Sequence, residues 1–292
     1  DLIIIDEFSM VDTWLANQLF SVIASTTQVI IVGDSDQLPS VGPGQVLSDL
    51  LKIDTLPQLA LTKIFRQSED STIVTLADQM RQGRLPADFT QKEPDRSYFE
   101  ASATYIPNMI AKIVQSAVKS GINPQEIQIL APMYRGAAGI NRLNTIIQDL
   151  LNPLDNQQDF AFGEMSFRKG DKILHLINDA ELNVFNGDIG YITDLIPAKY
   201  TESKQDELYL SFDGNEVIYP RNEWHKITLA YAMSIHKSQG SEFQVVILPI
   251  THQSRRLLQR NLIYTAITRS KSKLVMLGEL AAFDYAIKNE GD

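Results

Sequence analysis

A short apolar run that ends in two carboxylates is the feature that most limits what this chain can fold into. Residues 2–5 are apolar and rich in β-branched side chains, which predicts a strand buried on both faces, as inside a parallel sheet. Asp6 and Glu7 follow at its carboxyl end, where open α/β sheets bind ligands. Such a pair suits a nucleotide hydrolase in which Asp6 holds Mg²⁺ through water and Glu7 orients the attacking water. The competing interpretation is a strand that leaves the core through a charged turn.

A predicted amphipathic helix and a second apolar strand lead into loop 33–44, which is rich in glycine and proline. Strand, helix, strand and polar loop make a βαβ unit that ends in a ligand loop. Because sequential parallel strands usually lie side by side, we expect Asp34 and Gln37 of this loop to lie beside Asp6 and Glu7. The alternative is an ordinary glycine-rich connection.

The composition permits a polyanionic partner without requiring one. The 292 residues are 44% hydrophobic, enough for about two domains, and carry a net charge of −10. Residues 226–292 hold 9 basic and 5 acidic side chains and are therefore net positive, whereas residues 1–225 are acidic. The absence of cysteine excludes thiolate metal sites and fits a cytoplasmic protein, and no apolar run is long enough to predict a membrane span.

The order of several short motifs carries a family resemblance. Residues 6–10 (Asp-Glu-Phe-Ser-Met) and loop 33–44 resemble motifs II and III of the superfamily 1 helicases, in the version found in RecD-like DNA helicases. Further segments resemble the remaining motifs in the expected order, at 64–67, 131–141, 232–243 and 264–270. On these motifs the chain is identified as a member of that family, across nearly its whole length.

The resemblance implies an ATP and Mg²⁺ site between two motor domains. It makes Glu7 the residue that activates water, Gln37 the sensor of the γ-phosphate, and Arg66 and Arg269 arginine fingers. A guanidinium suits the last role because it is always charged and binds phosphate through two parallel hydrogen bonds. Further nucleotide-binding residues are implied at Asp6, Asp34, Gln67, Gly240 and Glu242.

The same resemblance implies a partner, single-stranded DNA, held mainly by its phosphates. The implied DNA-binding residues are Pro132, Met133, Tyr134, Asn141, Ser234, His236, Lys237 and Thr265. Met133 and Tyr134 would stack on or pack against unpaired bases, although both could instead be core side chains. Arg255, Arg256 and Arg260 could add phosphate contacts, or lie on a solvated helix face.

The predicted fold is α/β, with two RecA-like parallel-sheet motor domains, the first incomplete, and a small SH3-like β-barrel inserted in the second. The predicted domains are residues 1–88, residues 89–164 with 226–292, and the insert 165–225, which would grip the DNA strand or act as a spacer. The predicted helices include 71–84, with Gly83 as its C-cap, and 106–118. The strands predicted for the second sheet are 127–130, 227–233, 245–250 and 274–277.

The implied function is an ATP-dependent DNA helicase that moves 5′ to 3′ in repair or recombination, with unknown partner subunits. No Gly-x-x-x-x-Gly-Lys-Ser/Thr phosphate loop occurs in the sequence. We therefore expect a fragment of a longer protein that hydrolyses ATP negligibly alone. The alternatives are a related motor acting on RNA or within a conjugative relaxase, and a helicase-like scaffold that does not hydrolyse ATP.

Overall fold

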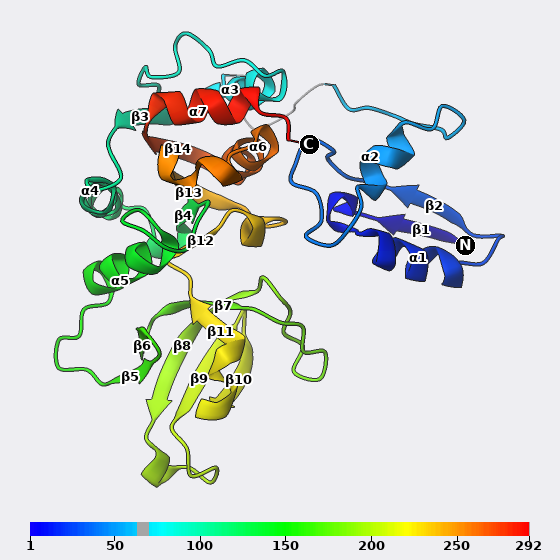
Figure 1. Ribbon diagram of the computed structural model, residues 1–292. Coiled ribbons are helices and arrows are strands. Elements are labelled where there is room, and N and C mark those ends of the chain that lie inside the picture. The colour runs from blue at the N-terminus through cyan, green and yellow to red at the C-terminus, as the bar shows by residue number, and fades with distance from the viewer. Residues whose placement is uncertain (63–69, 292) are drawn as a thin grey trace.

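The computed structural model describes residues 1–62 and 70–291, and Figure 1 shows three units along the chain. A small parallel sheet at the N-terminus is followed by a five-stranded parallel sheet, into which an antiparallel subdomain is inserted. This arrangement confirms the predicted α/β class with an inserted β subdomain. Across the described residues no helix has the length and apolar character needed to cross a bilayer.

The N-terminal unit is a βαβ element. Strands β1 (Leu2–Ile5) and β2 (Gln28–Ile31) pair in parallel, from Leu2 opposite Gln28 to Ile5 opposite Ile31. Helix α1 (Thr13–Val22) connects them, and it begins where the Asp12 carboxylate accepts a hydrogen bond from the Leu15 backbone N–H at 2.7 Å. After loop 33–44 the chain forms the short helix α2 (Val46–Leu51).

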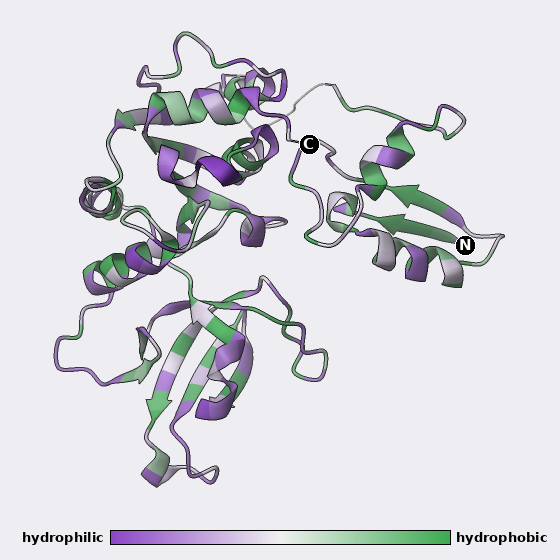
Figure 2. Cartoon of the chain, viewed as in Figure 1, coloured by the Kyte–Doolittle hydropathy of each residue, from purple (hydrophilic) through white to green (hydrophobic). Residues whose placement is uncertain are grey.

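The apolar side chains of β1 and β2 are largely exposed, although Figure 2 shows both strands as hydrophobic. Leu2 is 53% and Ile4 is 63% exposed, so the prediction of a strand buried on both faces is wrong for the described residues. A strand is buried on both faces when covering layers lie above and below its sheet. Residues 1–62 form a sheet of two strands, which leaves part of its surface uncovered.

The second sheet is entirely parallel, with the strand order β12-β4-β13-β14-β3. Its strands are β3 (Arg96–Glu100), β4 (Ile127–Ala131), β12 (Ala232–Ser234), β13 (Phe243–Ile250) and β14 (Ser270–Gly278). The helices around it are α3 (Thr72–Arg81), α4 (Ile106–Lys119), α5 (Ile140–Leu151), α6 (Arg260–Thr268) and α7 (Leu280–Lys288).

Two hydrophobic cores cover the two faces of this sheet. Successive strand residues alternate between them, so Ile129 packs with α4 and α5 while Leu130 packs with α3, α6 and α7. Helix α3 corresponds to the predicted helix 71–84, and Gly83 follows it with a positive φ of 77°. Helix α3 packs in the second core. The domain boundary predicted at residue 88 stays a prediction.

The inserted subdomain is an antiparallel sheet with the strand order β10-β9-β8-β7-β11. Its strands are β7 (Lys172–His175), β8 (Ile189–Ile196), β9 (Glu207–Phe212), β10 (Asn215–Pro220) and β11 (Ile227–Leu229), with the hairpin β5 (Asp159–Phe162) and β6 (Met165–Arg168) beside it. Short 3₁₀ turns complete the chain: η1 (Phe8–Met10), η2 (Pro124–Glu126), η3 (Ala198–Tyr200), η4 (Arg221–Lys226), η5 (His236–Ser238) and η6 (His252–Leu257). Trp224 is fully buried and stacks on Phe160, with ring centroids 5.7 Å apart.

The predicted strand 227–233 is two strands in two different sheets. Ile227 pairs antiparallel with His175 in the inserted sheet, whereas β12 pairs in parallel with β4. The apolar run gave no sign of this change of sheet, because both parts are buried and β-compatible. The Asn144 amide of α5 fixes the crossing, since it donates to the Leu229 and Ala232 carbonyls at 3.2 and 3.1 Å and accepts from the Ala232 N–H at 2.8 Å.

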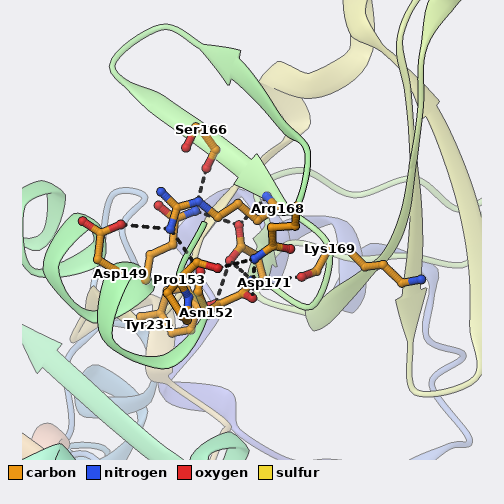
Figure 3. Close-up of polar contacts among 10 residues, drawn as sticks. Asp149, Asn152, Pro153, Ser166, Arg168, Lys169, Asp171 and Tyr231 are labelled. Atoms are coloured by element: carbon orange, nitrogen blue, oxygen red, sulfur yellow. Dashed lines mark hydrogen bonds and ion pairs between the residues drawn. The ribbon is translucent and has the colours of Figure 1, made fainter. Parts of the chain in front are cut away.

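A buried polar cluster joins the inserted subdomain to α5, and Figure 3 shows it converging on Asp171. One carboxylate oxygen of Asp171 accepts from Tyr231 Oη at 2.7 Å and from Asn152 Nδ2 at 2.8 Å. The other accepts from Gln148 Nε2 at 2.8 Å and from the Arg168 N–H at 2.7 Å. Burial raises the pKa of Asp171, and the four donors oppose that rise. Directional bonds of this kind fix how the subdomain leaves the five-stranded parallel sheet.

Candidate nucleotide-binding site

Asp6 and Glu7 are both exposed at the carboxyl end of β1. Glu7 has a left-handed backbone, with φ 55° and ψ 39°, and its N–H donates to Asp6 Oδ1 at 2.7 Å. The next residue, Phe8, is fully buried and its N–H donates to the Val32 carbonyl at 3.1 Å. A non-glycine residue in this conformation stores about 1–3 kcal/mol of strain. The left-handed turn leaves the Glu7 side chain exposed, and the buried Phe8 side chain holds the turn in place.

These carboxylates fit a water-linked Mg²⁺ better than a closed protein cage. Mg²⁺ keeps several waters and usually takes one or two carboxylates together with substrate phosphates. In the described residues no group of three or more histidine, aspartate or glutamate side chains could hold a metal by itself. Asp6 would thus hold the ion jointly with a bound nucleotide, with Glu7 beside it.

Asp34 and Gln37 of loop 33–44 contact each other, and their predicted position beside Asp6 and Glu7 stays a prediction. Gln37 Nε2 donates to Asp34 Oδ2 at 3.3 Å, and Asp34 Oδ1 accepts from the Asp36 N–H at 3.0 Å. Burial and the neighbouring Asp34 charge raise the pKa of Asp36, and the charge of Arg81 lowers it in part. The Asp36 carboxylate lies 3.7 Å from an Arg81 guanidinium nitrogen on α3.

The same loop contacts helix α6 and the segment before β13. Tyr264 Oη donates to Asp34 Oδ2 at 2.8 Å, and the Leu38 N–H donates to Thr265 Oγ1 at 2.8 Å. Gln239 Nε2 donates to the Leu38 carbonyl at 2.8 Å. Burial, followed by the Asp34 charge, raises the pKa of Tyr264, so this phenol stays a donor at neutral pH.

A cleft of about 310 Å³ lies between this loop and α6. Ser9, Gln37 and Asn261 line it, and each has a buried oxygen with no hydrogen-bond partner among the described residues. Arg81 and Arg260 line it as well. Buried polar atoms are nearly always hydrogen-bonded in proteins, so this cleft is built for water or a polar ligand.

Arg269, predicted as an arginine finger, is 6% exposed and is fixed by backbone and hydroxyl oxygens. Its Nη1 donates to the Ser241 carbonyl at 3.1 Å and its Nε donates to the Thr265 carbonyl at 3.2 Å. Gly240 and Glu242, predicted to bind nucleotide, flank Ser241 and are exposed. Gly240 has a positive φ of 78°, and a side chain there would meet no atom within 4 Å.

The predicted DNA-binding residues divide into exposed and buried ones. Tyr134 (51% exposed), Asn141 and His236 are exposed, and Pro132, Met133 and Lys237 are half-buried. Lys237 Nζ donates to Asn186 Oδ1 of the inserted subdomain at 2.6 Å.

Two predicted DNA ligands are buried instead. Thr265 has no exposed surface and its hydroxyl accepts from Leu38, so this structure offers no path from it to a DNA strand. Ser234 is 6% exposed and its Oγ accepts from the Lys237 N–H at 3.2 Å. Arg66 and Gln67 of motif 64–67 lie outside the described residues.

Sequence reasoning missed the residues that connect the two parallel units. Leu38, Gln239 and Tyr264 all lie inside recognised motifs, but their spacing of about 200 residues hides their contacts. An apolar residue in a polar loop was the one available signal, since Leu38 is 4% exposed and belongs to the core that includes α6.

Three family models match the chain. Residues 1–100 match an AAA domain, residues 229–277 a UvrD-like helicase C-terminal domain, and residues 143–212 an ATP-dependent RecD-like DNA helicase SH3 domain. The last match begins within α5, upstream of the predicted insert 165–225, whose bounds stay a prediction.

Relatives match over almost all of this chain. It is 32% identical to the ATP-dependent RecD2 DNA helicase of Deinococcus radiodurans, over 98% of this chain and 37% of that protein. It is 27% identical to the RecBCD enzyme subunit RecD of Mycolicibacterium smegmatis, over 99% of this chain and 52% of that subunit. The chain thus spans about half or less of the length of these relatives.

Solved structures show the same fold. Bacteroides Pif1 bound to ssDNA matches 94% of this chain and 70% of its own, with a TM-score of 0.56 at 19% identity. Pif1 helicase from Candida albicans matches 99% of this chain and 74% of its own, with a TM-score of 0.52 at 18% identity. The ordered motifs and the match of residues 229–277 to a helicase C-terminal domain indicate a likeness to the superfamily 1 helicases. The SH3-domain model and the curated relatives agree on the branch, so the chain is similar to the RecD-like helicases over nearly its whole length.

Proposed function

We propose that this chain forms the part of an ATP-driven motor that couples γ-phosphate sensing to movement along single-stranded DNA. The observation that carries the proposal is the direct contact between the Gln37 loop and helix α6, through Tyr264 to Asp34 and Thr265 to Leu38. A loop that both faces the nucleotide and grips the second domain can convert the loss of a phosphate into domain movement.

Different residues of the chain would carry out different steps of ATP hydrolysis. Asp6 would hold Mg²⁺ through water, Glu7 would take the proton of the attacking water, and Arg269 would neutralise charge that develops on the transferred phosphoryl group. Bound Mg²⁺ would supply charge neutralisation between the β- and γ-phosphates. The roles proposed for Gly240 and Glu242 are contacts to the nucleotide itself, which agree with their exposure. A 5′-to-3′ direction and a role in DNA repair or recombination are part of the proposal.

An ATPase measurement tests the hydrolytic part. We expect the complete gene product to hydrolyse ATP when single-stranded DNA and Mg²⁺ are present, and Glu7→Gln to lower that rate by about 10²–10⁴-fold, as loss of a general base does. Residues 1–292 alone should show negligible turnover, because they contain no phosphate-binding loop. Turnover by residues 1–292 that Glu7→Gln abolishes would contradict this last expectation, and a complete product that binds DNA without turnover would favour the scaffold.

A binding measurement tests the DNA contacts. Tyr134→Ala should weaken binding of a labelled oligo-dT about tenfold, because stacking on one base contributes about 1–3 kcal/mol, and oligo-dA should lose as much. Fluorescence anisotropy at low and moderate salt measures both affinities, and binding should fall steeply with salt because phosphate contacts dominate. Tyr105→Ala is the matched control, since Tyr105 is 66% exposed directly before α4 and lies outside the inserted subdomain. Equal affinities of the two variants would rule out stacking on Tyr134.

A further inference from the structure

One carboxylate oxygen connects the two parallel units. Asp34 Oδ2 accepts a hydrogen bond from Gln37 Nε2 at 3.3 Å and another from Tyr264 Oη of α6 at 2.8 Å. The bond from the phenol is the shorter of the two. Because it is partly buried, this hydrogen bond is stronger than the same bond would be in water. Any movement of α6 relative to loop 33–44 therefore acts first on the group that orients the Gln37 amide.

The backbone of the same loop is held on both sides of one residue, Leu38. The Leu38 N–H donates to Thr265 Oγ1 and the Leu38 carbonyl accepts from Gln239 Nε2, each at 2.8 Å. The Leu38 side chain is 4% exposed and packs in the core that contains Leu262 and Ile263 of α6. Separating the units would break these bonds and expose Leu38 together, so the contact is made or lost as a whole.

The Gln37 amide is left with a definite orientation. Its nitrogen donates to Asp34, and its buried Oε1 has no partner among the described residues. Gln37 lines the cleft together with Ser9 and Asn261. An amide held in this way keeps its oxygen free to accept a hydrogen bond from a ligand or water. If Asp34 moved away from Gln37, the amide would lose the hydrogen bond that fixes the positions of its nitrogen and its oxygen.

We propose that Tyr264 is a positioning residue that orients Gln37 through Asp34, and that Leu38 is the anchor that keeps Tyr264 and Asp34 in contact. This inference rests on the proposed function, since it makes α6 the element that sets the γ-phosphate sensor. It assigns a role to the Tyr264 hydroxyl through its hydrogen bond to Asp34.

The kinetic test uses the complete gene product with oligo-dT. Tyr264→Phe removes one hydroxyl and should lower kcat for ATP hydrolysis about tenfold, as expected for losing one hydrogen bond to a charged group, while KM for ATP stays within about twofold. Tyr191→Phe in the inserted sheet is the matched control and should leave both constants unchanged. The variant that combines Tyr264→Phe with Gln37→Ala should be no slower than Gln37→Ala alone. Additive losses in that pair, or a change confined to KM, would overturn the positioning role.

A distance measurement tests the anchor without any ATPase activity. The chain has no cysteine, so Asn17→Cys on α1 and Lys112→Cys on α4, both exposed, can be spin-labelled as a specific pair. Electron–electron double resonance should give one narrow distance distribution for this pair and a broad one when Leu38→Ala is added. Equal widths with and without Leu38→Ala would overturn the anchor even if the protein hydrolyses ATP. A broadened distribution in a protein that lacks turnover would leave the anchor intact and count against the proposed function instead.

Discussion

Replacing Arg269 by alanine is expected to lower the DNA-stimulated ATPase rate of the complete gene product by about 10³-fold or more, the usual effect of losing an arginine finger. The Ser241 and Thr265 carbonyls fix the guanidinium beside the exposed Gly240 and Glu242. A side chain held by backbone oxygens needs little reordering when phosphate charge develops, so its stabilising effect falls on the transition state. Single-turnover and steady-state ATP hydrolysis with saturating oligo-dT measure the loss.

Arg269→Lys separates charge from shape. Lysine keeps the positive charge but cannot bind two oxygens through a planar fork, so its rate should stay closer to that of Arg269→Ala than to that of the unmodified protein. Arg142→Ala, an exposed arginine on α5, controls for the loss of a positive charge alone. Because Arg269 is buried, thermal melting must show that each variant is folded. Rates within threefold of the unmodified protein for Arg269→Ala would exclude the finger role.

The positions of strands and helices followed from local patterns, but their surroundings did not. Runs of β-branched residues located β1 and β2, and helical spacing located α3. Whether β1 is buried depends on which layers cover its sheet, a property that residues 2–5 do not encode. The change of sheet between Leu229 and Ala232 escaped prediction for the same reason, since it is fixed by Asn144, which is remote in sequence.

The candidate site was predictable where chemistry restricts the residue type. Asp6 and Glu7 could be named as candidates because few side chains can hold Mg²⁺ or activate water, whereas Gln37 and Arg269 were implied by the family resemblance. Thr265 could not be assigned in this way, because a hydroxyl serves equally well as a DNA ligand or as the internal acceptor it is here. Tyr264 was invisible as a functional residue until its distance to Asp34 was known.

Asp171→Ala should lower the stability of the inserted subdomain by about 3 kcal/mol or more, because four buried donors lose their shared acceptor at once. Asp171→Asn should cost nearly as much. Each carboxylate oxygen accepts from two donors, so an amide nitrogen would face donors whichever way the asparagine is turned. This comparison distinguishes the hydrogen-bond network from simple loss of volume, since asparagine and aspartate have almost the same shape.

Trp224 provides a local probe for this measurement, because it is fully buried in the subdomain and the chain has one other tryptophan, Trp14. In a Trp14→Phe background, urea unfolding followed by Trp224 fluorescence should show the midpoint falling for both Asp171 variants. Asp155→Ala, an exposed aspartate in the connection that leads to β5, should leave the midpoint unchanged. If Asp171→Asn unfolds at the same urea concentration as the unmodified chain, the cluster does not hold the subdomain to α5. Its attachment would then come from apolar packing, such as that of Leu143 and Ile147, and the subdomain could tilt on α5 without a barrier from hydrogen bonds.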